Sequence, residues 1–257
     1  MMRAIGTMSG TSLDGVDVAL IETDGERVAA FGPAMVQPYS ADERALLRAA
    51  LAAARELAAR YERPGIVAEA EAMVTQRHAD AVRDFCASHG VGAVDVVGFH
   101  GQTVLHRPDK RLTIQIGDGA ALARALNVPV VYDLRAADMA AGGQGAPFVT
   151  VYHRALVADG TLQSPVAVVN IGGVSNITYS DGATLLACDT GPGNALLDDF
   201  MLRETGVAMD RDGAMAARGH ANEAWLAQAL AHPFFSRALP KSLDRDDFAA
   251  LNLPSMR

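Results

Sequence analysis

An apolar run, a turn of small residues and a second apolar run occur together twice in this chain, once in each half. In the first half the runs 3–8 and 16–22 flank SGTSLDG, and in the second half the runs 166–171 and 174–179 flank two glycines. Short apolar runs bounded by turn residues are typical of paired strands. Backbone N–H groups in Gly-rich turns bind anions, so the two turns could hold a polyphosphate from both sides.

The remaining pattern alternates between helix and strand, which predicts an α/β fold. The expected helices are 41–61, 67–89, 118–126, 148–157 and one that starts at 194; the expected strands are 28–36, 94–99, 128–134 and one that ends at 189, with turns at 108–109 and 181–182. Residues 140–147, AAGGQGAP, contain three glycines and a proline. This composition marks a candidate hinge.

Composition excludes several classes of protein. The 257 residues include 22 Lys+Arg and 30 Asp+Glu, a formal net charge of −8, which argues against nucleic acid as a partner. Cys86 and Cys188 lack the short Cys or His spacings of zinc and redox sites, and we interpret them as reduced thiols. We find neither a signal sequence nor a run of about 20 apolar residues that could cross a membrane, so we expect a cytoplasmic protein.

Familiar nucleotide and hydrolase motifs are absent from the sequence. Lys110 and Lys241 are its two lysines, and neither ends a Gly-rich loop, so there is no Walker A motif. The patterns G-x-G-x-x-G, G-x-S-x-G and H-E-x-x-H are also missing. Three other Gly-rich loops remain, at 6–17, 170–176 and 189–194. Any one of them could be a tight turn that needs glycine for positive φ, but three together favour phosphate binding.

Six segments, in this order, resemble the anhydro-N-acetylmuramic acid kinase family of the actin, heat-shock chaperone and sugar-kinase superfamily. They are GTMSGTSLDGVDVAL, GFHGQT, IQIGDG, VVYDLRAADMAAGGQGAP, VVNIGGVSNIT and DTGPGN, and the resemblance runs from Met2 to about Phe248. It implies a two-lobed actin-like (ribonuclease H-like) ATPase fold, with an N-terminal lobe at 1–138 and a C-terminal lobe at 139–257. It also implies ATP and Mg²⁺ as cofactors and a homodimer.

The resemblance implies an unusual reaction in peptidoglycan recycling. Water opens the 1,6-anhydro bridge of 1,6-anhydro-N-acetylmuramic acid while the freed 6-oxygen receives the γ-phosphoryl group of ATP, which gives N-acetylmuramic acid 6-phosphate. The bridging oxygen is an ether with no proton to lose, so a general base must activate water. A single displacement would invert the anomeric carbon. Positioning of the reactants and neutralisation of the phosphate charge by Mg²⁺ would drive the phosphoryl transfer.

The family match assigns roles to residues of the Gly-rich loops. Asp189 matches the catalytic base, and a carboxylate is ionised at neutral pH. The alternative for Asp189 is to cap the helix that follows Asn194. The residues that match ATP-binding positions are Gly10, Thr11, Ser12, Leu13, Asp14, Gly15, Val16, Asp17, Gly172, Gly173, Gly191 and Gly193.

The metal ligands stay unassigned. Asp14 or Asp17 could reach Mg²⁺ through water, but aspartate in a turn often serves only as an Asx-turn residue. Met8 stands where the wider superfamily usually has an aspartate. This departure leaves the source of metal coordination open.

The match places the sugar beside His100, Gln102 and Arg135, which we expect to follow the ends of strands. Arg135 could pair with the lactyl carboxylate of muramate. The alternatives are a satisfied core histidine for His100 and a surface ion pair for Arg135. Asp138 and Gln144 flank the hinge and could serve either the site or the turn.

Family members continue well beyond NLPSMR, the last residues here. We expect the absent part to complete the second lobe and to hold the adenosine. Two hypotheses follow: a working kinase, or a non-catalytic fragment that binds only sugar or phosphate. A third, another phosphotransferase or phosphatase of the superfamily, is disfavoured by the anhydro-sugar motifs.

Overall fold

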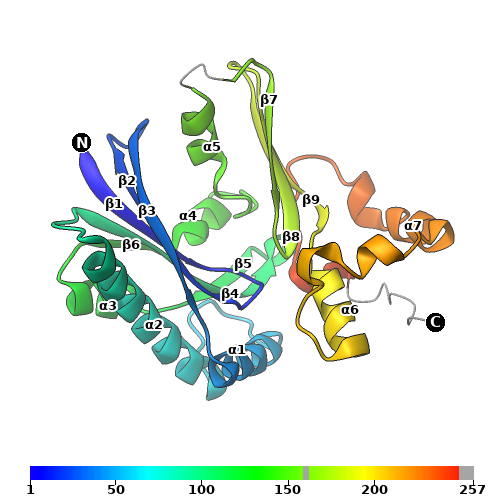
Figure 1. Cartoon of the computed structure of the whole chain (residues 1–257), viewed down its shortest axis with the longest axis horizontal. Coiled ribbons are helices and arrows are strands. Elements are labelled where there is room, and N and C mark those ends of the chain that lie inside the picture. The colour runs from blue at the N-terminus through cyan, green and yellow to red at the C-terminus, as the bar shows by residue number, and fades with distance from the viewer. Residues whose placement is uncertain (159–161, 249–257) are drawn as a thin grey trace. The chain divides into compact units, whose positions relative to one another are not determined.

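In a computed structural model, residues 1–158 and 162–248 are described, and the chain forms two compact units, Met1–Leu162 and Gln163–Arg257 (Figure 1). The lobe boundary expected after residue 138 stays a prediction. No helix among the described residues is long and apolar enough to span a bilayer.

The first unit is built on a mixed sheet. Its strands are β1 (Met2–Ser9), β2 (Gly15–Thr23), β3 (Val28–Pro38), β4 (Val96–Arg107), β5 (Leu112–Ile116) and β6 (Val130–Tyr132). The order is β3-β2-β1-β4-β5, and β6 also pairs with β4. The strands β1, β4 and β6 are parallel, whereas β2, β3 and β5 run antiparallel to their neighbours. This mixed α/β sheet confirms the ribonuclease H-like fold class that the family resemblance implied.

The helices of the first unit are α1 (Ala41–Ala54), α2 (Ile66–His89), α3 (Gly119–Leu126), α4 (Leu134–Ala140) and α5 (Thr150–Val157), and a short 3₁₀ turn, η1 (Pro108–Lys110), joins β4 to β5. Ser40 and Glu43 form a reciprocal capping box at the start of α1. Gly90 ends α2 in the left-handed conformation. The buried faces of α1 and α2 pack with the sheet into one core (Figure 1).

The second unit contains the antiparallel sheet β7-β8-β9, formed by β7 (Val166–Ile171), β8 (Val174–Ser180) and β9 (Leu185–Pro192). Helices α6 (Ala195–Thr205) and α7 (Glu223–Leu230) follow, with 3₁₀ turns η2 (Arg211–Gly213), η3 (Ala216–Arg218), η4 (Pro233–Ser236) and η5 (Arg245–Phe248). Its small core gathers around the side chains of Phe234, Leu243 and Phe248.

The predicted α/β fold is confirmed, but three expected elements were wrong in extent. The helix expected over 41–61 ends at Ala54, because the N–H groups of Arg55, Glu56 and Leu57 bond to carbonyl oxygens three residues back, in the tighter 3₁₀ pattern. The strand expected to end at 99 continues to Arg107, and the one expected to end at 189 continues to Pro192. Helix α4 was not predicted, because seven residues are too few to show a helical period.

Candidate functional site

The first Gly-rich turn connects β1 to β2. The Leu13 side chain is buried in the core, while Ser12 and Asp14 are exposed and the Ser12 hydroxyl donates to the Asp14 carboxylate at 2.9 Å. Leu13 has a left-handed φ of 58°. A Cβ at Gly15 would overlap the carbonyl oxygen of Gln37, so glycine permits the close approach of β3. The turn therefore presents its polar side chains outward on an anchored backbone.

Asp14 and Asp17 lie close enough to influence each other. Partial burial, and after it the charge of Asp14, raise the pKa of Asp17. Within the described ranges, no backbone N–H donates to the Asp14 carboxylate, so it does not form the Asx turn that was the alternative. The described residues include no group of three or more His, Cys, Asp or Glu that could hold a metal ion by themselves. Two carboxylates fit Mg²⁺ that keeps waters and phosphate oxygens as its other ligands.

The glycines of the second unit join two loops. The N–H groups of Gly193 and Asn194 donate to the carbonyl oxygens of Gly173 and Gly172, at 2.9 and 2.8 Å. A Cβ at Gly193 would overlap the Gly172 carbonyl oxygen. Gly191 has a φ of 152° and faces the ring of Phe235. In this structure the two N–H groups are thus engaged within the protein, and the glycines bring the loop after β7 against the loop after β9.

Asp189 lies within β9, opposite Asn176 of β8, and the residue is 5% exposed. Its Oδ2 accepts a hydrogen bond from the backbone N–H of Leu243 at 2.8 Å. The backbone N–H of Asp189 donates to the carbonyl oxygen of Lys241 at 3.0 Å. The N-cap position of helix α6 is Asn194, five residues after Asp189, so the capping alternative is wrong. The carboxylate is held by a segment distant in sequence.

Two amide oxygens in the same unit were missed by the sequence reasoning. The Oδ1 atoms of Asn176 and Asn194 are buried and have no hydrogen-bond partner among the residues described. Buried polar atoms without a partner mark places where water or a ligand binds. Asn176 belongs to the motif VVNIGGVSNIT and Asn194 to the motif DTGPGN. Membership of these motifs is the signal that could have identified them.

His100 and Gln102 lie inside β4 and not after its end, which corrects the expectation. The pairing of β1 with β4 shifts register at this point, and Gly101 has a positive φ of 68°. Gln102 is fully buried, and its side-chain oxygen accepts from the hydroxyl of Ser9. Tyr39 donates to the same hydroxyl at 3.0 Å. This network fixes the end of β1, just before the first Gly-rich turn.

Arg135, in the first turn of α4, binds His100 directly. Its Nε donates to His100 Nε2 at 3.0 Å, and one of its terminal nitrogens donates to the Gly145 carbonyl oxygen at 2.6 Å. Because Nε2 accepts, the proton of the neutral ring lies on Nδ1, which donates to the Gly101 carbonyl oxygen. Burial, and after it the charge of Arg135, lower the pKa of His100 to about 4. Arg135 therefore orients a neutral His100, and Asp138 serves the turn by accepting from the N–H of Gly145.

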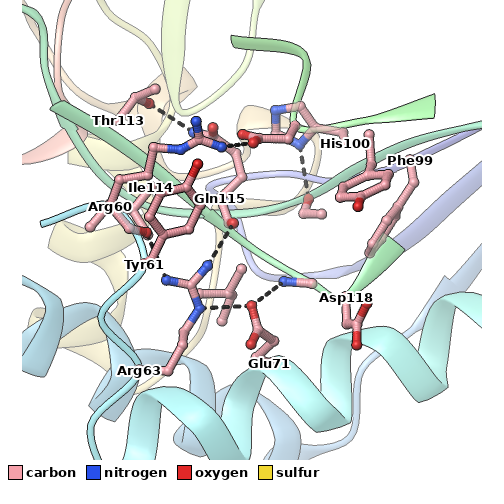
Figure 2. A pocket seen from close by; sticks show the side chains of 15 residues that line it. Arg60, Tyr61, Arg63, Glu71, Phe99, His100, Thr113, Ile114, Gln115 and Asp118 are labelled. Carbon is pink, nitrogen blue, oxygen red and sulfur yellow. Dashed lines mark hydrogen bonds and ion pairs between the residues drawn. The ribbon is translucent and has the colours of Figure 1, made fainter. Parts of the chain in front are cut away.

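A cavity of about 270 Å³ opens beside His100, entirely within the first unit. It lies where the parallel part of β4 and β6 end, at residues 99–101 and 132–133. The carboxyl ends of parallel strands are the usual place for ligands in α/β folds. Figure 2 shows Arg60 and Arg63 entering from one side, with His100 and Phe99 across from them. Its remaining lining residues are Tyr61, Glu71, Gly101, Thr113, Ile114, Gln115, Ile116, Gly117, Asp118, Tyr132 and Asp133.

Ion pairs and hydrogen bonds hold the wall of this cavity. Glu71 accepts from Arg63 Nε at 2.7 Å and from the backbone N–H of Gly117 at 3.1 Å. Asp118 caps α3 through the N–H of Ala121. Of the residues in this wall, the sequence predicted only His100, because Arg60 was assigned to the helix expected over 41–61 and Arg63 to the connection after it. The motif IQIGDG was the available signal for residues 114–118. The site offers hydrogen bonds of both kinds and charges of both signs to a polar ligand.

Comparison with known proteins gives a consistent result. The family described as anhydro-N-acetylmuramic acid kinase matches residues 2–255. A protein of that name from Nitrobacter winogradskyi is 65% identical and is matched over 99% of this chain and 70% of its own length. Proteins of the same name from Rhodopseudomonas palustris (strain BisB18) and Bradyrhizobium diazoefficiens are each 64% identical, over 99% and 98% of this chain and over 71% and 70% of their own lengths. The relatives contain residues that have no counterpart in this sequence.

Proposed function

Because the chain belongs to the anhydro-N-acetylmuramic acid kinase family, a family of phosphotransferases, we propose that it phosphorylates 1,6-anhydro-N-acetylmuramic acid with ATP. In this reaction the bond between C1 and the bridging oxygen breaks, and a water oxygen bonds to C1. The bridging oxygen stays on C6 and receives the γ-phosphoryl group, and ADP leaves. The product is N-acetylmuramic acid 6-phosphate.

The observation that carries this proposal is the placement of Asp189. Its carboxylate lies in DTGPGN, is almost fully buried, and is oriented by the N–H of Leu243. A carboxylate fixed in this way can accept the proton of the attacking water. We assign the base role to Asp189, and inversion at the anomeric carbon follows from the single displacement.

The first Gly-rich turn and the glycines of the second unit are the proposed phosphate-binding elements. Ser12 and Thr11 supply hydroxyl donors, and Asp14 and Asp17 would hold Mg²⁺ through water. When bound, Mg²⁺ neutralises charge on the phosphates during transfer. The closeness of the two carboxylates supports this assignment: burial, and after it the charge of Asp14, raise the pKa of Asp17, and a bound cation would offset both effects.

The sugar site we propose is the cavity beside His100. Its volume of about 270 Å³ suits a monosaccharide derivative, and its wall is polar. His100 is a positioned, neutral hydrogen-bonding group there, and Arg135 keeps its ring in place. Gln102 supports the site from inside the core through Ser9.

The test is ADP release by the purified chain with Mg-ATP, with and without 1,6-anhydro-N-acetylmuramic acid, together with identification of the sugar product. Sugar-dependent ADP release and a 6-phosphate are expected. A folded chain that binds the sugar without turnover would favour the binding-only hypothesis. A homodimer in the cytoplasm, proposed from family resemblance alone, is tested by light scattering and cell fractionation.

A further inference from the structure

Three arginines lie in or near the wall of the cavity beside His100, and two of them donate hydrogen bonds to protein groups that hold this wall. Arg63 donates through Nε to Glu71 and through its terminal nitrogens to the carbonyl oxygens of Arg60, Glu62 and Gln115. Arg135 donates to His100 and Gly145 and does not line the cavity. Neither guanidinium can turn to a ligand without breaking bonds that hold the wall.

Arg60 differs from both. Its side chain lines the cavity and is 30% exposed, and one of its terminal nitrogens pairs with the Asp133 carboxylate. In residues 1–158 and 162–248, no other hydrogen bond or ion pair reaches this guanidinium, which lies over the ring of Tyr61 at 4.7 Å. A guanidinium has five N–H donors in a planar fork, so Arg60 keeps an edge available for a second acceptor.

Asp133 compensates the positive charge of Arg60 within the protein. It follows β6 directly, and its backbone has a left-handed φ of 59°. Its side chain is 33% exposed, similar to that of Arg60. An ion pair whose two side chains are each about one-third exposed contributes little to stability, so the guanidinium can share its charge with a ligand at small cost.

We propose that Arg60 is the residue that selects an acidic sugar: its free edge binds the lactyl carboxylate of 1,6-anhydro-N-acetylmuramic acid, while Asp133 retains the other edge. This assignment rests on the proposed function and replaces Arg135 as the carboxylate partner. Arg135 then acts as a positioning residue for His100. The matched neutral ligand is 1,6-anhydro-N-acetylglucosamine, which lacks the lactyl group.

Binding of both sugars to the full chain without ATP, measured by calorimetry, tests the assignment. The wild type is expected to prefer the acidic sugar. Arg60→Gln should weaken binding of the acidic sugar by about 10- to 100-fold and leave the neutral sugar within about twofold. Arg48→Gln, an exposed arginine away from the cavity, should change neither affinity. Arg135→Gln should weaken both sugars to a similar degree.

A second measurement needs no variant. The methyl ester of the acidic sugar should bind the wild type about as weakly as the neutral sugar does. The assignment is overturned if the ester binds as tightly as the acid, or if the Arg60→Gln protein still prefers the acidic sugar to the neutral one. It is also overturned if only the Arg135→Gln protein loses that preference. If the wild type binds neither sugar, the proposed function itself fails.

Discussion

The carboxylate of Asp189 accepts a hydrogen bond from the backbone N–H of Leu243 at 2.8 Å, across 54 residues of sequence. Together with the bond from the Asp189 N–H to Lys241, this contact fastens residues 241–243 to β9. The proposed base is therefore oriented by the main chain of a segment that forms no regular strand or helix. Changes at that segment should affect the reaction without touching a ligand.

Asp189→Asn should lower turnover by about 10²- to 10⁴-fold, because asparagine cannot accept the proton of water. The amide oxygen still accepts from Leu243, so folding and sugar binding should stay near wild type. Turnover and calorimetric sugar binding are the two measurements. Asp181→Asn is the matched control, since Asp181 is exposed and accepts only turn bonds that asparagine can also accept. Retained turnover in Asp189→Asn would remove the residue from the base role.

Gly193→Ala should destabilise the second unit by about 1–3 kcal/mol, because the new Cβ overlaps the Gly172 carbonyl oxygen. Chemical unfolding followed by the fluorescence of Trp225 measures this directly. The control is Gly172→Ala in the facing loop, where the nearest atom is 3.6 Å away and alanine fits. Equal stabilities for the two variants would show that the two loops are not packed as described.

Gln102→Ala should lower the free energy of unfolding by about 1–3 kcal/mol, because the hydroxyl of Ser9 loses its buried acceptor. Sugar affinity should change little, since Gln102 is fully buried. A large loss of affinity in a variant of unchanged stability would contradict this supporting role and return Gln102 to direct contact with the sugar.

Three buried histidines should make the first unit sensitive to acid. Burial is the first cause that lowers the pKa values of His78, His100 and His106 to about 4, and the charge of Arg135 adds to it at His100 and His106. Between about pH 6.5 and about 4 the unfolded chain binds these protons and the folded chain does not, so stability falls as pH falls.

Each of these histidines costs at most about 1.4 kcal/mol per pH unit in that window. Urea unfolding at pH 7 and pH 5 measures the sum, and NMR of the imidazole protons assigns it to single residues. Equal stability at the two pH values, or an imidazole that titrates near 6.5 in the folded chain, would be incompatible with these burials.

Local signals were sufficient for most of the fold. Capping by Ser40 and Asp118, the left-handed Gly90 and the Gly172–Gly173 turn are each determined by nearby residues, and the elements they bound were predicted. The end of α1 was not, because apolar residues continue at helical spacing to Leu57, whereas the chain leaves the helix after Ala54 in tighter turns and Leu57 is buried in the core from there. Strand β4 continues past Phe99 because β5 pairs with it from Gln102 to Arg107.

The candidate site was predictable only in part, for a similar reason. The family resemblance predicted Asp189 and His100, because they lie in the motifs DTGPGN and GFHGQT that carry it. The contacts of Arg60 with Asp133 and of Asp189 with Leu243 join residues far apart in sequence, and spacing along the chain does not predict them.

The most direct measurement is to run the reaction in ¹⁸O-labelled water and locate the label by mass spectrometry soon after mixing. The account predicts one ¹⁸O on C1 of the sugar 6-phosphate and none in the phosphoryl group, because water attacks the anomeric carbon and the bridging oxygen receives the phosphoryl group. Label in inorganic phosphate, with no label in the sugar, would mean that water attacks ATP and would contradict the proposed kinase.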